Sequence, residues 1–204
     1  MPVSESKSLV RARALARRSE LSPADRDASA LGLVKHSAWH VEGKVVGGYH
    51  AIGHEIDPLP LLDRFNAAGA ILCLPVLLDQ TTMVFRRWNP ARPLVPVGFG
   101  TLGPDETQAQ CIPQILLMPL VAFSASGNRI GYGKGHYDRA IAKFRQNGAD
   151  PVRVGIAYAC QEVADIVNEP HDVPLDGILT PDGLIICPAG ETRLAPFISD
   201  SGGR

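Results

Sequence analysis

The sequence has little of what marks a membrane protein or a general nucleic-acid binder. No apolar run approaches the roughly 18 residues that a membrane span needs. No apolar stretch near the amino-terminus suggests a secretory signal. The 20 basic and 21 acidic side chains nearly cancel, which leaves no overall positive field to attract nucleic acid. These absences predict a cytoplasmic protein with neither a membrane nor a nucleic-acid partner, and we expect a monomer.

Cysteine is scarce and widely spaced. The four cysteines form no Cys-x-x-Cys pair, which argues against a disulfide framework. His50 and His54 have the spacing of helical zinc ligands, but the neighbouring glycines disfavour a helix there. A hydrophobic content of 45% in 204 residues is enough for a sizeable core. We therefore expect reduced thiols and a single domain over residues 1–198, followed by a frayed tail over residues 199–204.

Positive charge is concentrated at the amino-terminus, where the first 18 residues hold five basic side chains and one acid. Apolar residues recur among them at helical spacing, which predicts a short amphipathic helix. Lys7 and Arg11 lie four residues apart, so they share one face and could clamp one anion. Arg13, Arg17 and Arg18 are assigned to a solvated face. The alternatives for the whole segment are a purely solvated basic face and a nucleic-acid-binding arm.

Helix signals and apolar runs alternate along most of the chain. Residues 70–76 and 115–119 are continuous apolar runs, which are typical of strands buried on both faces. The pattern predicts an α/β fold, a three-layer sandwich whose mostly parallel sheet is flanked by helices on both faces. Ligands of such folds bind in the loops after the carboxyl ends of strands. The candidate loops are residues 47–57, 119–138 and 158–174.

Residues 129–138 carry the most informative pattern, Arg-Ile-Gly-Tyr-Gly-Lys-Gly-His-Tyr-Asp. Glycine at every second position leaves backbone amides free to converge on an anion, and Lys134 adds a positive charge. The run lacks the Ser or Thr of a Walker A loop and the last glycine of a dinucleotide fingerprint. It predicts phosphate binding between a strand and a helix, with a simple tight turn as the alternative.

Two carboxylates near these loops have both an ordinary and a functional interpretation. Asp138 stands at the expected start of a helix, where it is either an N-cap or a Mg²⁺ ligand beside bound phosphates. Glu55 stands in the loop after the first expected strand, where it either faces water or accepts paired N–H donors from a heterocyclic ligand. Ser124 and Ser126 have no patterned His/Asp partner, which disfavours a serine nucleophile.

Taken in order, the motifs resemble the 5-formyltetrahydrofolate cyclo-ligase (5,10-methenyltetrahydrofolate synthetase) family. The resemblance runs from about residue 5 to residue 180, and its specific part is the glycine-lysine-glycine run that leads into Tyr-Asp. The matching segments are Lys7-x-x-x-Arg11, residues 49–57, Cys73-Leu-Pro-Val76, residues 94–100, residues 118–127, residues 129–139 and residues 171–176.

The resemblance implies ATP-dependent cyclisation of 5-formyltetrahydrofolate to 5,10-methenyltetrahydrofolate with Mg²⁺. Arg129 and Lys134 would act on the reacting phosphate, Asp138 and Asp176 would hold Mg²⁺, and a set of neighbouring residues would surround ATP. That set is Lys7, Arg11, Arg129, Gly131, Tyr132, Gly133, Lys134, Gly135, His136 and Tyr137. The residues expected at the folate are His50, Glu55 and Tyr137, with Phe85, Trp88 and Phe99 as candidates for an apolar wall.

Two residues depart from the family pattern. Tyr132 stands where many members have Arg, and His136 replaces the first Tyr of the usual Tyr-Tyr-Asp. The departures leave two other functions open. One is a relative that acts on another formamide or amine, and the other is a non-catalytic nucleotide- or folate-binding module.

Overall fold

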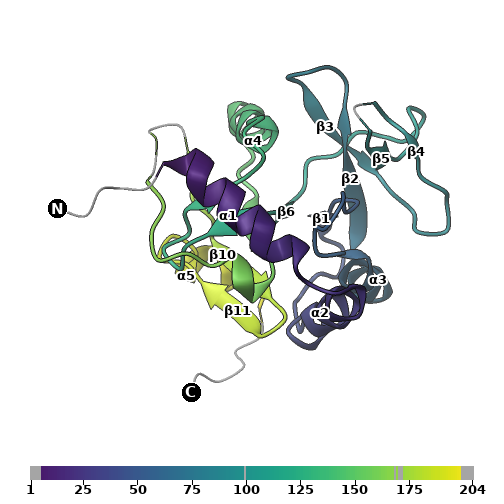
Figure 1. The fold of residues 1–204 in the computed structure, drawn as a ribbon. Helices are drawn as coiled ribbons and strands as arrows, with labels where there is room; N and C mark the ends of the chain where they lie inside the picture. The colour runs from purple at the N-terminus through teal and green to yellow at the C-terminus, as the bar shows by residue number, and fades with distance from the viewer. Residues whose placement is uncertain (1–5, 99, 168, 170–171, 199–204) are drawn as a thin grey trace.

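The computed structural model describes residues 6–98, 100–167, 169 and 172–198. Its central sheet has seven strands in the order β11-β10-β9-β6-β1-β2-β3 (Figure 1). The inner five are parallel, and β3 and β11 pair antiparallel at the two edges. The predicted mostly parallel sheet is therefore confirmed. The strands are β1 (Val45–Gly47), β2 (Ile71–Leu77), β3 (Met83–Arg87), β6 (Ile115–Pro119), β9 (Val152–Ile156), β10 (Gly177–Thr180) and β11 (Gly183–Ile186).

Alternate side chains of the inner strands enter two different cores. On β2, Leu72 and Leu74 pack in the same cluster as residues of α2 (Pro23–Lys35) and α3 (Leu59–Ala67). Cys73, between them, packs in a second cluster with residues of α4 (His136–Gln146). Because successive side chains of a strand point to opposite faces, each cluster marks one face of the sheet. Helices thus cover both faces, as the sequence predicted.

The helix boundaries follow local signals with some shifts. The Ser22 hydroxyl accepts the Asp25 N–H at 3.1 Å and caps α2, which ends at Lys35. Helix α4 begins at His136 instead of Asp138, because Gly135 adopts a left-handed conformation (φ +63°) that turns the chain into the helix early. Asp138 therefore lies inside the first turn and is not an N-cap.

A smaller layer lies beside the sheet. It consists of α1 (Lys7–Ser19) and the hairpin of β7 (Ala122–Phe123) and β8 (Arg129–Ile130). Val10 and Ala14 of α1 pack against Val121, Ala122 and Ile130, so the helix is held next to the hairpin that leads into the glycine run (Figure 1).

The remaining elements are short. β4 (Val95–Pro96) and β5 (Leu102–Gly103) form a small antiparallel hairpin in the chain between β3 and β6. The 3₁₀ turn η1 (Ala159–Gln161) follows β9, and α5 (Glu191–Leu194) follows β11. The predicted frayed tail, residues 199–204, lies outside the described residues. Within the described part of the chain, every helix is too short or too polar to cross a bilayer.

The order of the strands reverses between β1 and β6. From β1 the chain moves outward to β2 and β3, whereas from β6 it moves the other way to β9, β10 and β11. In open α/β sheets, ligands bind at the carboxyl ends of the two strands that flank such a switch point. The loop after β1 carries Glu55, and the chain after β6 leads to the glycine run. The topology therefore places two predicted site segments at the same edge.

Candidate active site

The loop after β1 holds a carboxylate in a protected position. Glu55 is 7% exposed, and its Oε2 accepts the backbone N–H of Ile52 at 2.9 Å. The buried Tyr49 hydroxyl donates to the Ile56 carbonyl at 2.7 Å and fixes the far side of the same loop. Burial raises the pKa of Glu55, while the Ile52 bond and the nearby Arg18 charge act in the opposite direction. Glu55 is thus a structured loop carboxylate and not a solvated one.

A cavity of about 230 Å³ opens beside this loop. His50 and Glu55 both line it, so the structure brings together two of the residues predicted to contact the folate. Tyr158, after β9, and Arg26, from the first turns of α2, line it from other elements. Tyr137 is not among the lining residues, but its pKa is raised by burial and then by the charge of Glu55, which places the two side chains near each other.

The glycine run forms an open turn in front of α4. Gly133 and Gly135 have φ values of +83° and +63°, a conformation that side chains other than glycine rarely adopt. A side chain at Gly131 would meet no atom within 4 Å, so its backbone faces free space. Lys134 is exposed, and its carbonyl accepts the Arg139 Nη2 at 2.6 Å. The turn therefore presents backbone and a cation to solvent, as an anion site requires.

His136 is the first residue of α4 and a departure from the family pattern. Its Nδ1 lies 3.2 Å from Arg139 Nη2. Partial burial, followed by the charges of Arg139 and Lys134, lowers the pKa of His136 below its usual 6.5. The ring is therefore predominantly neutral at pH 7 and adds little positive charge to the turn.

Helix α1 contacts the glycine run through Arg11. The Arg11 Nε donates to the Gly131 carbonyl at 2.8 Å, and its guanidinium lies close to Gly133. Lys7 has different partners, because its Nζ lies 2.6 Å from Asp172 and 3.3 Å from Glu169. Burial alone would lower the pKa of Lys7, but these two carboxylates raise it. The two residues share a helix, as predicted, yet only Arg11 contacts the turn.

The cation and carboxylate that flank the turn are paired with each other. The guanidinium of Arg129 contacts the carboxylate of Asp138 and also the backbone carbonyl of Val173. The Asp138 side chain is 28% exposed, so it stays accessible from solvent, while Arg129 is 11% exposed. The structure thus joins a residue predicted to act on phosphate to one predicted to bind Mg²⁺.

Asp176 lies in a different environment. Its side chain has no exposure, and both oxygens accept hydrogen bonds from Arg153 at 2.8 to 2.9 Å. Arg193 Nε lies 2.9 Å from Oδ1 on the other side. No group of three or more metal-ligating side chains occurs among the described residues. These contacts are those of a structural ion pair, and Mg²⁺ binding by Asp176 stays a prediction from the resemblance.

The assignment of Arg18 to a solvated face is wrong, because the structure buries this side chain against the glycine turn. Arg18 is 4% exposed, its Nη2 donates to the Tyr132 hydroxyl at 2.6 Å, and its guanidinium lies 5.7 Å from the Tyr132 ring centroid. The Tyr132 side chain also acts on Glu55, because it lowers the pKa of that carboxyl group. The signal was available: Val10, Ala14 and Arg18 recur at every fourth position, and the first two are the apolar side of α1.

The apolar wall expected for the folate is not formed by Phe85. That ring is 1% exposed and packs against Phe144 of α4 with a centroid distance of 6.0 Å, so it belongs to the core. Trp88 is 8% exposed and lies in the other core cluster. Phe99 lies outside the described residues. Packing between helices and the sheet buries Phe85 and Trp88, and the sequence pattern alone did not reveal this burial.

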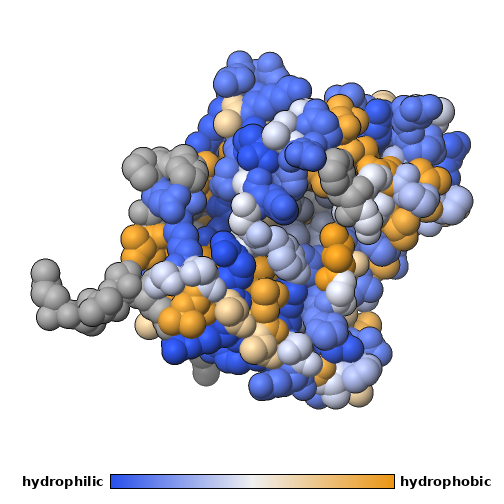
Figure 2. Space-filling view, turned by 45° about the horizontal axis from the view of Figure 1, so that its top comes forward, coloured by the Kyte–Doolittle hydropathy of each residue, from blue (hydrophilic) through white to orange (hydrophobic). Residues whose placement is uncertain are grey.

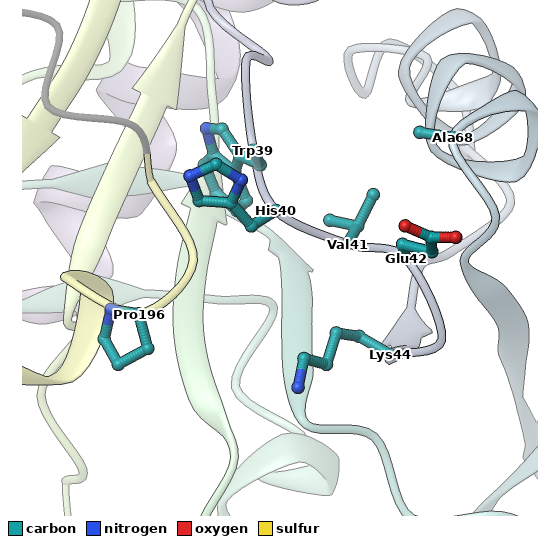
Figure 3. Close-up of a pocket in the computed structure, with 7 residues that line it drawn as sticks. All are labelled: Trp39, His40, Val41, Glu42, Lys44, Ala68 and Pro196. Atoms are coloured by element: carbon teal, nitrogen blue, oxygen red, sulfur yellow. The ribbon is translucent and has the colours of Figure 1, made fainter.

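A larger hollow, of about 330 Å³, lies elsewhere (Figure 3). Lys44 and Glu42 line it, together with Trp39 and His40. Lys44 immediately precedes β1, so this hollow opens at the amino ends of the parallel strands. It is therefore separate from the loops that follow the carboxyl ends, and size alone does not identify the candidate site.

The surface around α4 is predominantly hydrophilic, with apolar atoms in scattered patches (Figure 2). Single apolar residues of this kind are normal on soluble proteins and need no partner. A polar, partly cationic face next to the glycine turn suits a phosphorylated ligand better than an apolar one.

The fold and the site define the class of protein: a doubly wound α/β protein with an open glycine turn and a buried carboxylate near its topological switch point. The comparisons then give the family. The model of the 5-formyltetrahydrofolate cyclo-ligase family matches residues 3–181. The chain belongs to this family, and the predicted family, fold and cyclo-ligase class are confirmed.

Individual relatives support the same assignment. A 5-formyltetrahydrofolate cyclo-ligase from Haemophilus influenzae is 33% identical over 156 residues, which cover 74% of this chain and 80% of that protein. One from Mycolicibacterium smegmatis is 32% identical and covers 86% of this chain and 94% of that protein.

The solved structures agree with the fold. The 5,10-methenyltetrahydrofolate synthetase of Aquifex aeolicus has a TM-score of 0.73 and 26% identity, over 89% of this chain and 93% of that one. The Mycoplasma pneumoniae synthetase has a TM-score of 0.68 over 87% of this chain and 99% of that one; at 22% identity it supports the fold alone.

Proposed function

We propose that this chain converts 5-formyltetrahydrofolate and ATP into 5,10-methenyltetrahydrofolate, ADP and phosphate. Family membership supports the reaction. The observation that connects this reaction to the structure is the link between the glycine turn and the loop that lines the cavity. Arg18 holds Tyr132 of the glycine turn, and Tyr132 interacts with Glu55 of the cavity loop. A nucleotide on the turn and a folate in the cavity would therefore be neighbours.

The glycine turn fits a nucleotide triphosphate. Its backbone is open at Gly131, and Lys134 and Arg11 supply positive charge from two different elements. His136 and Tyr137 begin the helix whose amino-terminus points its free amides at the same region. These features support ATP as the ligand of this turn.

Asp138 fits Mg²⁺, which in nucleotide sites takes one or two carboxylates together with phosphate oxygens and water. Its carboxylate is accessible and lies in the first turn of α4. When bound, the ion would neutralise phosphate charge. Asp176 would have to leave Arg153 and Arg193 to contribute, so we assign the metal primarily to Asp138.

The proposed chemistry needs positioning and charge neutralisation more than a strong base. The formyl oxygen attacks the γ-phosphorus, the bond from that phosphorus to the bridging oxygen breaks, and ADP leaves. The resulting iminium phosphate is attacked at carbon by N10, which loses its proton, and phosphate leaves as the ring closes. Lys134 and Arg129 would stabilise the charge on the transferring phosphoryl group.

Glu55 would orient the folate by accepting hydrogen bonds from N–H groups of its heterocycle. A carboxylate that is already buried loses little further hydration when the ligand arrives, so each bond is strong. His50 lines the same cavity and offers a second polar contact. The retained Glu55 favours a folate over another formamide or amine substrate. A binding module without catalysis would not need Lys134, Arg129 and Asp138 together.

The proposal also includes the cellular compartment and the oligomeric state of the protein. The four cysteines are all unpaired in the structure, which suits a reducing compartment, and we propose the cytoplasm. We expect a monomer, to be checked by sedimentation.

The deciding assay combines 5-formyltetrahydrofolate, ATP and Mg²⁺ and follows methenyltetrahydrofolate by its absorbance and ADP by a coupled enzyme. We expect the two products in equal amounts. Folded protein that forms neither product would refute the proposal. Turnover with a different formamide, and none with the folate, would favour the relative with another substrate.

A further inference from the structure

Tyr158 carries a buried polar atom that the fold does not use. The residue follows β9 and is 3% exposed, and its ring packs in the same core cluster as β1 and β2. Its hydroxyl oxygen is buried and has no hydrogen-bond partner among the described residues. Tyr49 provides the contrast, because its buried hydroxyl donates to the Ile56 carbonyl at 2.7 Å.

An unpartnered hydroxyl in a protein interior is unfavourable, since it has given up hydrogen bonds to water and gained none. Native structures rarely leave such groups unless a ligand, water or ion completes them. Tyr158 lines the 230 Å³ cavity that also contains Glu55 and His50. We therefore expect a ligand bound in this cavity to provide the missing hydrogen-bond partner of the Tyr158 hydroxyl.

The local charges indicate which way the hydrogen bond would run. Burial is the main cause that raises the pKa of Tyr158 to about 12, while Arg26 and Arg18 act against it and Cys160 and Asp57 add to it. The phenol therefore keeps its proton at physiological pH and is able to donate. Glu55, in the loop after β1, is a carboxylate and accepts hydrogen bonds.

We propose that the Tyr158 hydroxyl donates a hydrogen bond to a carbonyl oxygen of the folate heterocycle, while Glu55 accepts from the N–H groups of the same ring. The two residues would then favour a heterocycle that carries both a carbonyl and N–H groups on one edge over a heterocycle that lacks the carbonyl. Tyr158 would thus contribute to specificity for the folate. This inference rests on the proposed function.

The test is Tyr158→Phe, which removes one oxygen atom and keeps the ring that packs in the core. We expect KM for 5-formyltetrahydrofolate to rise about five-fold, the equivalent of about 1 kcal/mol for one neutral hydrogen bond. Because ATP binds at the glycine turn, KM for ATP and kcat should stay within two-fold of their wild-type values. The melting temperature should not fall, since no internal bond is lost.

Tyr49→Phe is the matched control for stability. It makes the same change at a buried tyrosine in the loop after β1 but removes a hydroxyl that has a partner, so its melting temperature should fall. An unchanged folate KM in Tyr158→Phe would overturn the inference. So would a lower melting temperature with no change in KM, which would show an internal partner.

Equilibrium binding of 5-formyltetrahydrofolate without ATP provides a second measurement that does not depend on turnover. We expect the dissociation constant of Tyr158→Phe to rise by the same factor as KM. If wild-type protein shows no turnover of this substrate, the proposed function fails. If wild-type protein turns over and the variant binds equally well, only the role of Tyr158 fails.

Discussion

Replacing Asp176 by asparagine separates a structural role from a metal-binding role. The side chain is inaccessible and bonds to Arg153, which is itself 4% exposed, and it contacts Arg193, which is 30% exposed. Asparagine keeps the shape but removes the negative charge that compensates these guanidiniums. Breaking a buried ion pair from one side costs about 3 to 5 kcal/mol, because it leaves the other charge buried without its partner.

The structure favours the lower end of that range. Asp150 lies 3.8 Å from Arg153 and 3.0 Å from Arg193, so some compensation survives the substitution. We therefore expect a loss of about 3 kcal/mol in the free energy of unfolding. For a chain of this size that is a drop of about 10 °C in melting temperature.

Urea unfolding with and without Mg²⁺ measures the effect. The control is Asp63→Asn on α3, an exposed acid whose substitution should change stability by about 0.5 kcal/mol or less. A double variant, Asp176→Leu with Arg153→Met, should recover part of the loss, because removing both charges ends the imbalance. If Asp176→Asn unfolds like wild type and instead requires at least ten-fold more Mg²⁺ for turnover, the structural interpretation is wrong and Asp176 is a metal ligand.

Three further predictions concern the two halves of the site. Glu55→Gln should raise the folate KM, yet the variant should melt at a higher temperature than wild type at pH 8, because burial raises the pKa of Glu55 and its ionisation then opposes folding. This gain in melting temperature should disappear as the pH falls below about 4.5, and a lower melting temperature at pH 8 would contradict the prediction. Lys134→Ala should reduce kcat/KM for ATP by roughly 10²-fold, as loss of a transition-state contact does, whereas the exposed Lys35→Ala should not change it, and equal effects would remove the phosphate role. Arg18→Met should raise KM for both substrates about five-fold, because it frees Tyr132 from its donor; unchanged KM values would show that this contact does not position the turn.

The local parts of the site could be read from the sequence. The alternating glycines predicted an open turn, and Gly133 and Gly135 do adopt left-handed conformations there. Apolar residues at helical spacing around Lys7 and Arg11 predicted one helix, and the Ser22 side chain caps the start of the next. These signals act over three or four residues, through backbone sterics and capping, so they need no knowledge of the rest of the chain.

The partners of the charged residues were decided only by the tertiary structure. Arg18 and Tyr132 are separated by 114 residues, and Arg153 and Asp176 by 23. Helical spacing places Arg18 on the apolar side of α1, but the residue that it contacts there depends on which loops and strands lie beside the helix. Thus the sequence by itself determined the elements and the chemistry of the turn. The reversal of strand order between β1 and β6 decided which distant side chains meet, because only that packing brings the two loops to one edge of the sheet.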